Sequence, residues 1–195
     1  HVVWVIANEP SVPYFNWFAA KARETGALTF TFIALYPERP RMIDEMREKG
    51  WDCYWIPFDA GKRKRSMIRA VFSLYKMFRK LKPDVVHTHL FDDSLPGMLA
   101  ARLAGVPVRV ITKQDTTFHW NYAPAYVRFD RMNNRNATHI QAIATRNRQF
   151  IIEKENAQAS KVNIIRHGSP PEIMTAADDA TINRLKTEYN MHGRI

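Results

Sequence analysis

Side chains that can bind a ligand or move a proton stand directly after several short apolar runs of this sequence. Carboxylates and imidazoles are the usual general acids and bases of enzymes, so Asp115 and His119 are candidate catalytic residues. The guanidinium of Arg146 is suited to a phosphate. The full set of candidates is Asn8 and Glu9, His89, Gln114 and Asp115, His119, Arg146, and His167 with Gly168.

Two of these positions leave alternatives open. His87 and His89 lie two residues apart and share one face of an expected strand. A metal pair is one interpretation, but no third ligand is evident, so we expect no metal. In the other, His87 is buried with its nitrogens bonded to backbone and His89 lines a site. The aromatic residues of the expected loop 114–122 form either a sugar-stacking platform or an ordinary polar loop.

Several common functions lack their motifs. The first expected turn, residues 8–13, contains no Gly-x-Gly-x-x-Gly, and the sequence has no Gly-x-x-x-x-Gly-Lys-Ser/Thr loop. NAD enzymes and P-loop nucleotide hydrolases are therefore disfavoured. Cys53 is the only cysteine, which excludes an internal disulfide and fits a small core residue.

A net charge of +10 points to anionic partners, and the basic residues concentrate around one expected helix, 65–81. The stripe has two interpretations: a solvated face, or a dock for anionic lipid with aromatic insertion. Nucleic acid is not expected, because no recognition motif accompanies the charge. The dock would comprise Lys62, Arg63, Lys64, Arg65, Arg69, Phe72, Lys76, Arg79 and Lys80.

The candidate residues can form one site only if the fold places the ends of the apolar runs close together. Residues 82–113 read as strand, helix and strand: Val85–His89, a helix capped by Asp92, Asp93 or Ser94 and ended by Gly105, then Val106–Thr112. Strand and helix patterns alternate along the whole chain. The pattern predicts an α/β fold, a Rossmann-like open parallel sheet of about seven strands with helices on both faces. Ligands bind such sheets at the carboxyl ends of the strands.

The expected elements can be placed by residue. Strands are expected at 1–7, 28–36, 51–57, 85–89, 106–112, 138–144 and 161–166, and helices at 14–24, 37–49, 65–81, 92–104, 124–136, 145–156 and 178–190. We expect one domain at 1–169, with 170–195 as a linker and first helix leading to a missing second domain. No run is long enough to span a bilayer and no signal segment is evident, which predicts a cytoplasmic chain.

The run Pro83–His89, followed by a helix that ends in Ala104–Pro107, resembles the amino-terminal domain of retaining glycosyltransferases of family 4, which have the GT-B fold. Lys161–Gly168 is similar to the family's strand before the inter-domain linker. Residues 178–191 are similar to the helix that opens the second domain. The resemblance covers essentially the whole chain.

The resemblance implies the acceptor half of an enzyme that moves a sugar from a nucleotide sugar to a glycan or lipid-linked acceptor, in cell-surface polysaccharide biosynthesis. The missing domain would bind most of the nucleotide sugar, so this segment would be inactive alone. No metal or other cofactor is expected. The alternatives are a GT-B sugar-nucleotide 2-epimerase and a non-catalytic basic module that binds anionic membrane or polymer.

The same resemblance suggests roles for the candidates. Asn8, Glu9, His89 and Gln114 would line the acceptor pocket, whereas Arg146, His167 and Gly168 would lie on the donor or hinge side. The chain departs from the family at two places. Prolines replace the usual glycine-rich first loop, and Gln114 occupies the position of a His that contacts the donor sugar in the family. His119 is the candidate to take over that contact.

Overall fold

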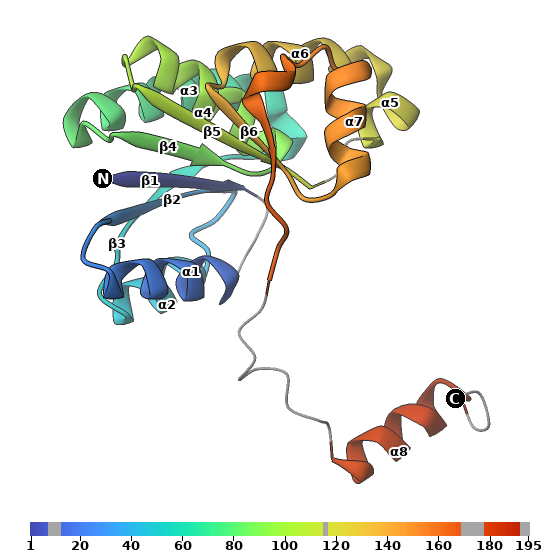
Figure 1. Cartoon of the computed structure of the whole chain (residues 1–195). Helices are drawn as coiled ribbons and strands as arrows, with labels where there is room; N and C mark the ends of the chain where they lie inside the picture. Colours follow the sequence, from blue (N-terminus) through green and yellow to red (C-terminus); the bar gives the residue numbers. More distant parts are fainter. Residues whose placement is uncertain (8–12, 115–116, 169–177, 192–195) are drawn as a thin grey trace.

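The computed structural model describes residues 1–7, 13–114, 117–168 and 178–191. Seven parallel strands form one sheet in the order β3-β2-β1-β4-β5-β6-β7 (Figure 1). The predicted α/β class and parallel sheet are therefore confirmed. The strands are β1 (Val2–Ala7), β2 (Phe30–Tyr36), β3 (Asp52–Pro57), β4 (Val85–Thr88), β5 (Val108–Lys113), β6 (His139–Ala142) and β7 (Val162–Ile164).

The order of the strands creates one reversal next to β1. The chain builds β1, β2 and β3 toward one edge, then returns to place β4 against the other side of β1, in the register Trp4↔His87. All six residues of β1 are buried, as expected for a central strand covered on both faces. A crevice at the carboxyl ends of the strands is typical of such a reversal, so β1 and β4 mark where a ligand should bind.

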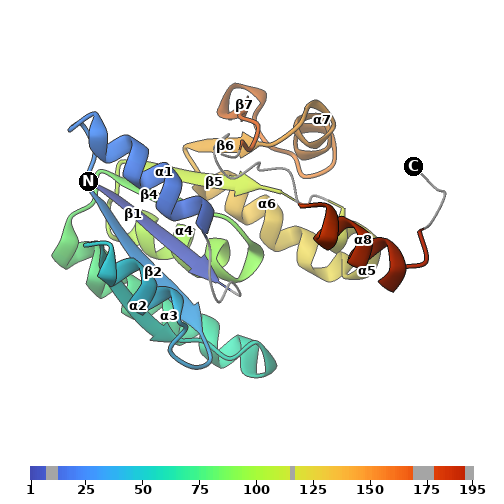
Figure 2. The same cartoon turned by 90° about the horizontal axis from the view of Figure 1, so that it is seen from below.

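Helices cover both faces of the sheet in two layers. Figure 1 shows α1 and α2 on one side and α3, α4 and α6 on the other, and each side has its own apolar core. Figure 2 shows that the strands point toward the side of the molecule where α5 lies. The helices are α1 (Pro13–Glu24), α2 (Met42–Glu48), α3 (Arg63–Leu81), α4 (Phe91–Leu103), α5 (Phe118–Tyr122), α6 (Val127–Asn136), α7 (Thr145–Glu153) and α8 (Asp179–Glu188).

Helix α4 begins one residue earlier than the sequence predicted. Its N-cap residue is Leu90, so Asp92, Asp93 and Ser94 lie inside the first turn and the predicted N-cap position is wrong, although Asp93 still caps the helix from its third position. The Asp93 carboxylate instead reaches back to accept a hydrogen bond from the Leu90 N–H at 2.9 Å. Gly97 lets this helix approach β4, since a Cβ there would lie 2.7 Å from the Thr88 methyl carbon.

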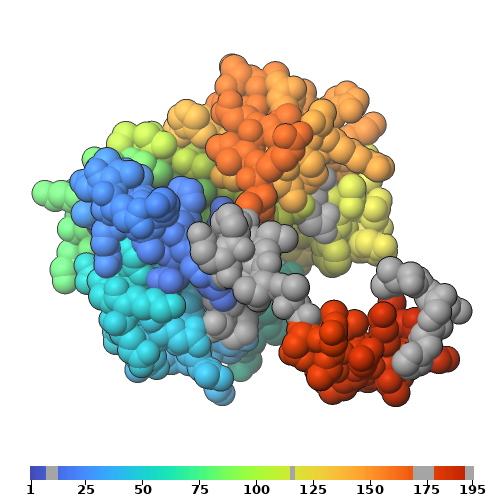
Figure 3. Space-filling view, turned by 60° about the horizontal axis from the view of Figure 1, so that its bottom comes forward, coloured from blue at the N-terminus to red at the C-terminus, as the bar shows by residue number. Residues whose placement is uncertain are grey.

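Three further elements differ from the sequence prediction. Residues 118–122 form the short helix α5 instead of a loop, and α3 begins at Arg63 after a 3₁₀ turn, Ala60–Lys62. Helix α2 begins at Met42 rather than at residue 37. The final helix, α8, has no buried residue and stands apart from the body of the domain in Figure 3. The predicted linker, residues 170–177, lies outside the described residues.

Candidate functional site

Two cavities lie at the carboxyl ends of β1, β4 and β5, and three residues line both: His89, Leu90 and Gln114. The first, which we call the tyrosine cavity, has a volume of about 290 Å³ and is completed by Tyr14, His167 and Gly168 among others. The second, the lysine cavity, has a volume of about 190 Å³ and is completed by Lys113, His119 and Asp130 among others. The site therefore lies where the strand order predicted a crevice.

His89 stands between the two cavities. Its side chain is almost fully buried, and neither ring nitrogen has a hydrogen-bond partner among the described residues. The ring stacks on His87 at 4.4 Å and meets the edge of Phe15 at 4.5 Å. Burial, with smaller contributions from the neighbouring His87 and His167, lowers the pKa of His89 well below its ordinary value. The imidazole is therefore neutral and can offer a ligand one N–H and one acceptor nitrogen.

His87 has a structural role. Its Nε2 lies 2.8 Å from the Thr112 hydroxyl. That hydroxyl also lies 3.2 Å from the oxygen of the Gln141 side-chain amide. The partner of Nε2 is thus a side chain of the neighbouring strand, β5. The sequence analysis had predicted a backbone partner instead. Burial lowers the pKa of His87 to about 3, so this ring is neutral as well. Among the described residues, no group of three or more His, Cys, Asp and Glu side chains is arranged to hold a metal ion.

Asp93 holds the floor of the site in place and was missed as a functional residue by sequence reasoning. Its carboxylate is completely buried and accepts hydrogen bonds from the backbone N–H groups of Ala7, His89 and Leu90, at 3.1, 2.8 and 2.9 Å. The Ser94 hydroxyl adds a fourth at 3.2 Å. Burial raises the pKa of Asp93 to about 7, although the four donors oppose this shift. One side chain thus joins the end of β1 to the turn that carries His89.

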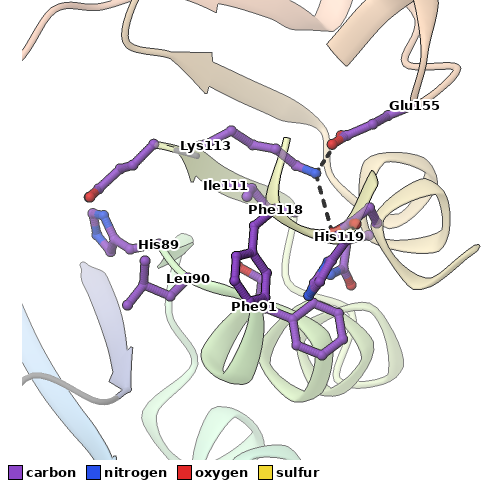
Figure 4. A pocket seen from close by; sticks show the side chains of 12 residues that line it. His89, Leu90, Phe91, Ile111, Lys113, Phe118, His119 and Glu155 are labelled. Atoms are coloured by element: carbon purple, nitrogen blue, oxygen red, sulfur yellow. Dashed lines mark hydrogen bonds and ion pairs between the residues drawn. The ribbon is translucent and has the colours of Figure 1, made fainter. Parts of the chain in front are cut away.

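A buried ionic network forms the far wall of the lysine cavity. The Lys113 ammonium lies 2.5 Å from a Glu155 carboxylate oxygen and 3.7 Å from Asp130. The Nδ1 atom of His119 lies 2.7 Å from the other Asp130 oxygen. Figure 4 shows Lys113 reaching across the cavity toward Glu155, with His89 at one end and the rings of Phe91, Phe118 and His119 on the opposite side.

The structure brings together only part of the predicted set. His89, Gln114, His167 and Gly168 line the tyrosine cavity, and Tyr14 packs on His167 with ring centres 5.1 Å apart.

The remaining predicted residues fall elsewhere. His119 lines the lysine cavity, whereas Arg146 is exposed at the start of α7 and lines neither cavity. Asn8, Glu9 and Asp115 lie outside the described residues. The sequence analysis did not predict Lys113, Asp130 or Glu155 as site residues. The one available signal was Lys113 itself, a charged residue at the end of a strand pattern.

The predicted basic stripe lies on the outer side of α3. Lys64, Arg65, Arg69, Lys76, Arg79 and Lys80 are exposed there, together with the apolar side chains of Ile68 and Phe72, which are 61% and 64% exposed. Arg63 differs, because its Nε lies 3.1 Å from Asp92 and its guanidinium turns inward. Lys62 is exposed and lies 4.0 Å from Asp59. No described helix is long and apolar enough to cross a membrane.

Comparison with solved structures identifies the class of fold. The chain is similar to a glycosyltransferase from Rickettsia africae, with a TM-score of 0.67 and 13% identity, covering 100% of this chain and 50% of that one. It is similar to Anabaena HepE in complex with UDP, with a TM-score of 0.68, 11% identity and coverage of 97% and 50%. A UDP-N-acetylglucosamine 2-epimerase matches with a TM-score of 0.67, 15% identity and coverage of 87% and 52%. The chain thus has the fold of the amino-terminal half of a GT-B protein.

Sequence comparison then gives the family. The family described as "Glycosyl transferase 4-like domain" matches residues 11–168, and the chain belongs to it. A 51-residue stretch is 45% identical to the Escherichia coli UDP-Gal:alpha-D-GlcNAc-diphosphoundecaprenol alpha-1,3-galactosyltransferase. That stretch is 26% of this chain and 13% of the relative, and the chain spans about half the length of the solved structures named above.

Proposed function

We propose that this chain is the acceptor half of a retaining glycosyltransferase that moves a hexose from a nucleotide sugar to a glycan or lipid-linked acceptor in cell-surface polysaccharide biosynthesis. The observation that carries the proposal is the pair of cavities that meet at His89, in a domain of the glycosyl transferase 4-like family. The partial relative's name includes a diphosphoundecaprenol acceptor, and the HepE structure contains UDP. Both support a nucleotide-sugar donor and a lipid-linked acceptor.

The donor would enter from the side of the tyrosine cavity. His167 and Gly168 line this cavity directly before the linker, so a following domain would close over it. The donor sugar would then face His89 and Gln114. Arg146 is 32 residues downstream of Gln114 and outside both cavities, so its predicted contact with a phosphate requires the second domain to reach the start of α7.

His119 is the described residue best placed to handle the proton of an acceptor hydroxyl. Asp130 fixes the ring through Nδ1 and leaves Nε2 for a ligand. In the transfer, the bond from the sugar C1 to the donor phosphate breaks, the acceptor oxygen bonds to C1 on the same face, and the hydroxyl proton passes to a base. Asp115 remains a second candidate for that base. No metal is proposed in the reaction.

We also propose that the enzyme is peripheral on the anionic cytoplasmic face of the inner membrane. The supporting observation extends beyond α3. The outer layer of helices α3, α4 and α6 contains three acidic residues, Asp92, Asp93 and Asp130, and all of them are buried. Arg128, Arg131 and Arg135 on α6 are exposed, like the cations of α3. An outer face with cations, exposed apolar side chains and no exposed carboxylate on its helices suits an anionic bilayer.

The test is a transfer assay with the full-length protein, a labelled UDP-hexose and an undecaprenyl-diphosphate sugar in vesicles. We expect acceptor-dependent release of UDP and a product whose new linkage keeps the donor's anomeric configuration by proton NMR. Epimerised nucleotide sugar without acceptor would replace the proposal with the 2-epimerase, whose fold is shared. If the protein catalyses neither reaction but binds the vesicles, the result would favour a non-catalytic module.

A further inference from the structure

A row of polar side chains crosses the sheet from β4 to β6 and lines neither cavity. We call it the polar row: His87 on β4, Thr112 on β5 and Gln141 on β6. Beyond the contacts of His87 and Thr112 described above, the Gln141 side-chain nitrogen lies 3.2 Å from the backbone carbonyl of Ile165, the residue after β7. Thr112 and Gln141 are paired in register, so their side chains lie on the same face of the sheet.

The last acceptor fixes the direction of every hydrogen bond in the polar row. The Ile165 carbonyl can only accept, so the Gln141 amide turns its nitrogen toward it and its oxygen toward Thr112. The amide oxygen can also only accept, so the Thr112 hydroxyl donates its single proton to it. His87 must then donate to the hydroxyl oxygen from Nε2. In the opposite tautomer the hydroxyl would donate to His87, and two acceptor oxygens would face each other 3.2 Å apart.

Both ends of the polar row lie next to residues of the tyrosine cavity. The His87 ring stacks on His89, which lines that cavity. At the other end, Ile165 is two residues before His167, which also lines it. Two residues of extended chain span about 7 Å at most. The polar row therefore connects the supports of two histidines that come from different strands.

Hydrogen bonds hold the backbone at Ile165 more than packing does. The Ile165 side chain is 55% exposed, so burial contributes little to its position. Its N–H donates to the Ala142 carbonyl at 2.9 Å, and its C=O accepts from the Gln141 side chain. Loss of the second bond would remove one of these two attachments to β6, directly before the segment that carries His167.

We infer that Thr112 and Gln141 are positioning residues, which hold His167 in a fixed place relative to His89. His87, neutral because of its burial, is the first donor of the row, with its proton on Nε2. The effect on sugar transfer rests on the proposed function, in which the donor enters from the side of the tyrosine cavity. The tautomer of His87 and the placement of His167 do not depend on that function.

The first test reads the imidazoles by NMR in the full-length protein labelled with ¹⁵N, with His87→Gln to assign the His87 signals. We expect a neutral His87 ring with its proton on Nε2. Thr112→Val, which removes the hydroxyl at nearly constant shape, should lose this single tautomer, and Thr112→Ser should keep it. A wild-type ring protonated on Nδ1, or a charged one, would overturn the inference without the need for any folded variant.

The same spectra report the placement of His167, whose ring centre lies 5.1 Å from that of Tyr14. Gln141→Leu and Thr112→Val should each shift the His167 ring signals, because the ring moves relative to Tyr14. Thr31→Val, which removes a buried hydroxyl on β2 away from both cavities, should leave them unchanged. Unchanged His167 signals in both Gln141→Leu and Thr112→Val would reject the positioning role.

The second test is the KM for the nucleotide sugar in the transfer assay. Gln141→Leu and Thr112→Val should each raise this KM about tenfold, the equivalent of one lost hydrogen bond, and Thr112→Ser should stay within about twofold of wild type. Normal transfer with an unchanged donor KM in both folded variants would reject the positioning role and leave the proposed function standing. The expected tautomer and His167 shifts, in a full-length protein that transfers no sugar, would support the positioning role and reject the proposed function.

Discussion

Single buried groups set the geometry of this site more than any surface residue does. His89 is held from its backbone side by Asp93 and from its ring side by His87 and Phe15. The Asp93 carboxylate also binds the backbone of Ala7, the last residue of β1. The position of the imidazole relative to β1 therefore depends on one carboxylate with four donors.

Asp93→Ala should lower the free energy of unfolding by about 3 kcal/mol, because it leaves three buried backbone N–H groups without an acceptor. Urea unfolding followed by circular dichroism measures the change. Asp52→Ala, at an exposed position on β3, is the matched control and should stay within about 0.5 kcal/mol of wild type. Similar losses in the two variants would contradict the role given to Asp93.

His87 and His89, whose pKa values are both lowered in the folded protein, predict a pH dependence of stability. Above pH 6.5 the rings are neutral in both states. As the pH falls below 6.5, the unfolded chain takes up protons on both rings, whereas folded His87 stays neutral down to about pH 3. Each ring therefore costs up to ~1.4 kcal/mol of stability per pH unit as the pH falls, and the raised pKa of Asp93 offsets the contribution of one ring in the same range.

His87→Gln should reduce that dependence, because one of the two rings no longer titrates in the unfolded state. The measurement is the free energy of unfolding from urea titrations at several pH values between about 7 and 5. Asp93, whose pKa is about 7, titrates in this range with the opposite slope, but wild type and variant share that contribution. His139→Gln, at an exposed position, should retain the slope of wild type. A slope in His87→Gln equal to that of wild type would show that His87 is charged or exposed in the folded protein.

The sequence predicted the site residues that directly follow strands and missed those that meet only through the fold. His89, Gln114 and His167 follow strand patterns, and all three reach one cavity. Lys113 and Glu155 are 42 residues apart, and their ion pair depends on how α6 and α7 pack beside β5. No local pattern encodes such a pair. Asp93 was predicted as a helix cap because its identity favours one, but its actual partners include a residue on another strand.

At the scale of elements, α3 has an apolar side and a basic side. Its inner side packs Ala70, Leu74 and Phe78 into the core against α4, which fixes the helix on the sheet. Its outer side has cations around Ile68 and Phe72 and no acidic residue. The residues that the sequence analysis named for the basic stripe are exposed, except Arg63, which is half-buried. The start of the helix was less predictable, because the 3₁₀ turn before it has no apolar pattern of its own.

Arg69→Glu combined with Lys76→Glu should weaken binding to anionic vesicles at least tenfold, since each basic residue near such a surface contributes about 1 kcal/mol and each acid adds repulsion. Sedimentation with phosphatidylglycerol vesicles measures the effect, which should diminish in high salt. The matched control is Arg41→Glu with Lys49→Glu, which makes the same charge change around α2 on the other side of the sheet. Equal losses of vesicle binding in both double variants would show that net charge alone drives the binding. Unchanged binding in both would contradict the proposed lipid dock.

At the scale of the molecule, one parallel sheet of seven strands separates two apolar cores among the described residues. Strand alternation was enough to predict this sheet, because buried parallel strands and helices differ in length and period. His167 and Gly168, which line the tyrosine cavity, follow the last strand of this sheet. Under the proposed function, a donor held beside them would also contact a second domain.

The last prediction follows from the proposed division of the enzyme into two halves. A protein limited to residues 1–195 should release no UDP from a UDP-hexose, with or without acceptor, whereas the full-length protein should do so. The physical reason is that the described cavities contain one ammonium, which is paired with carboxylates, and so offer little to hold a diphosphate. Coupled detection of UDP measures the release, and circular dichroism of the shorter protein confirms that it is folded. Turnover by the folded shorter protein would place a complete donor site within this domain and would contradict the division of labour proposed for the two halves.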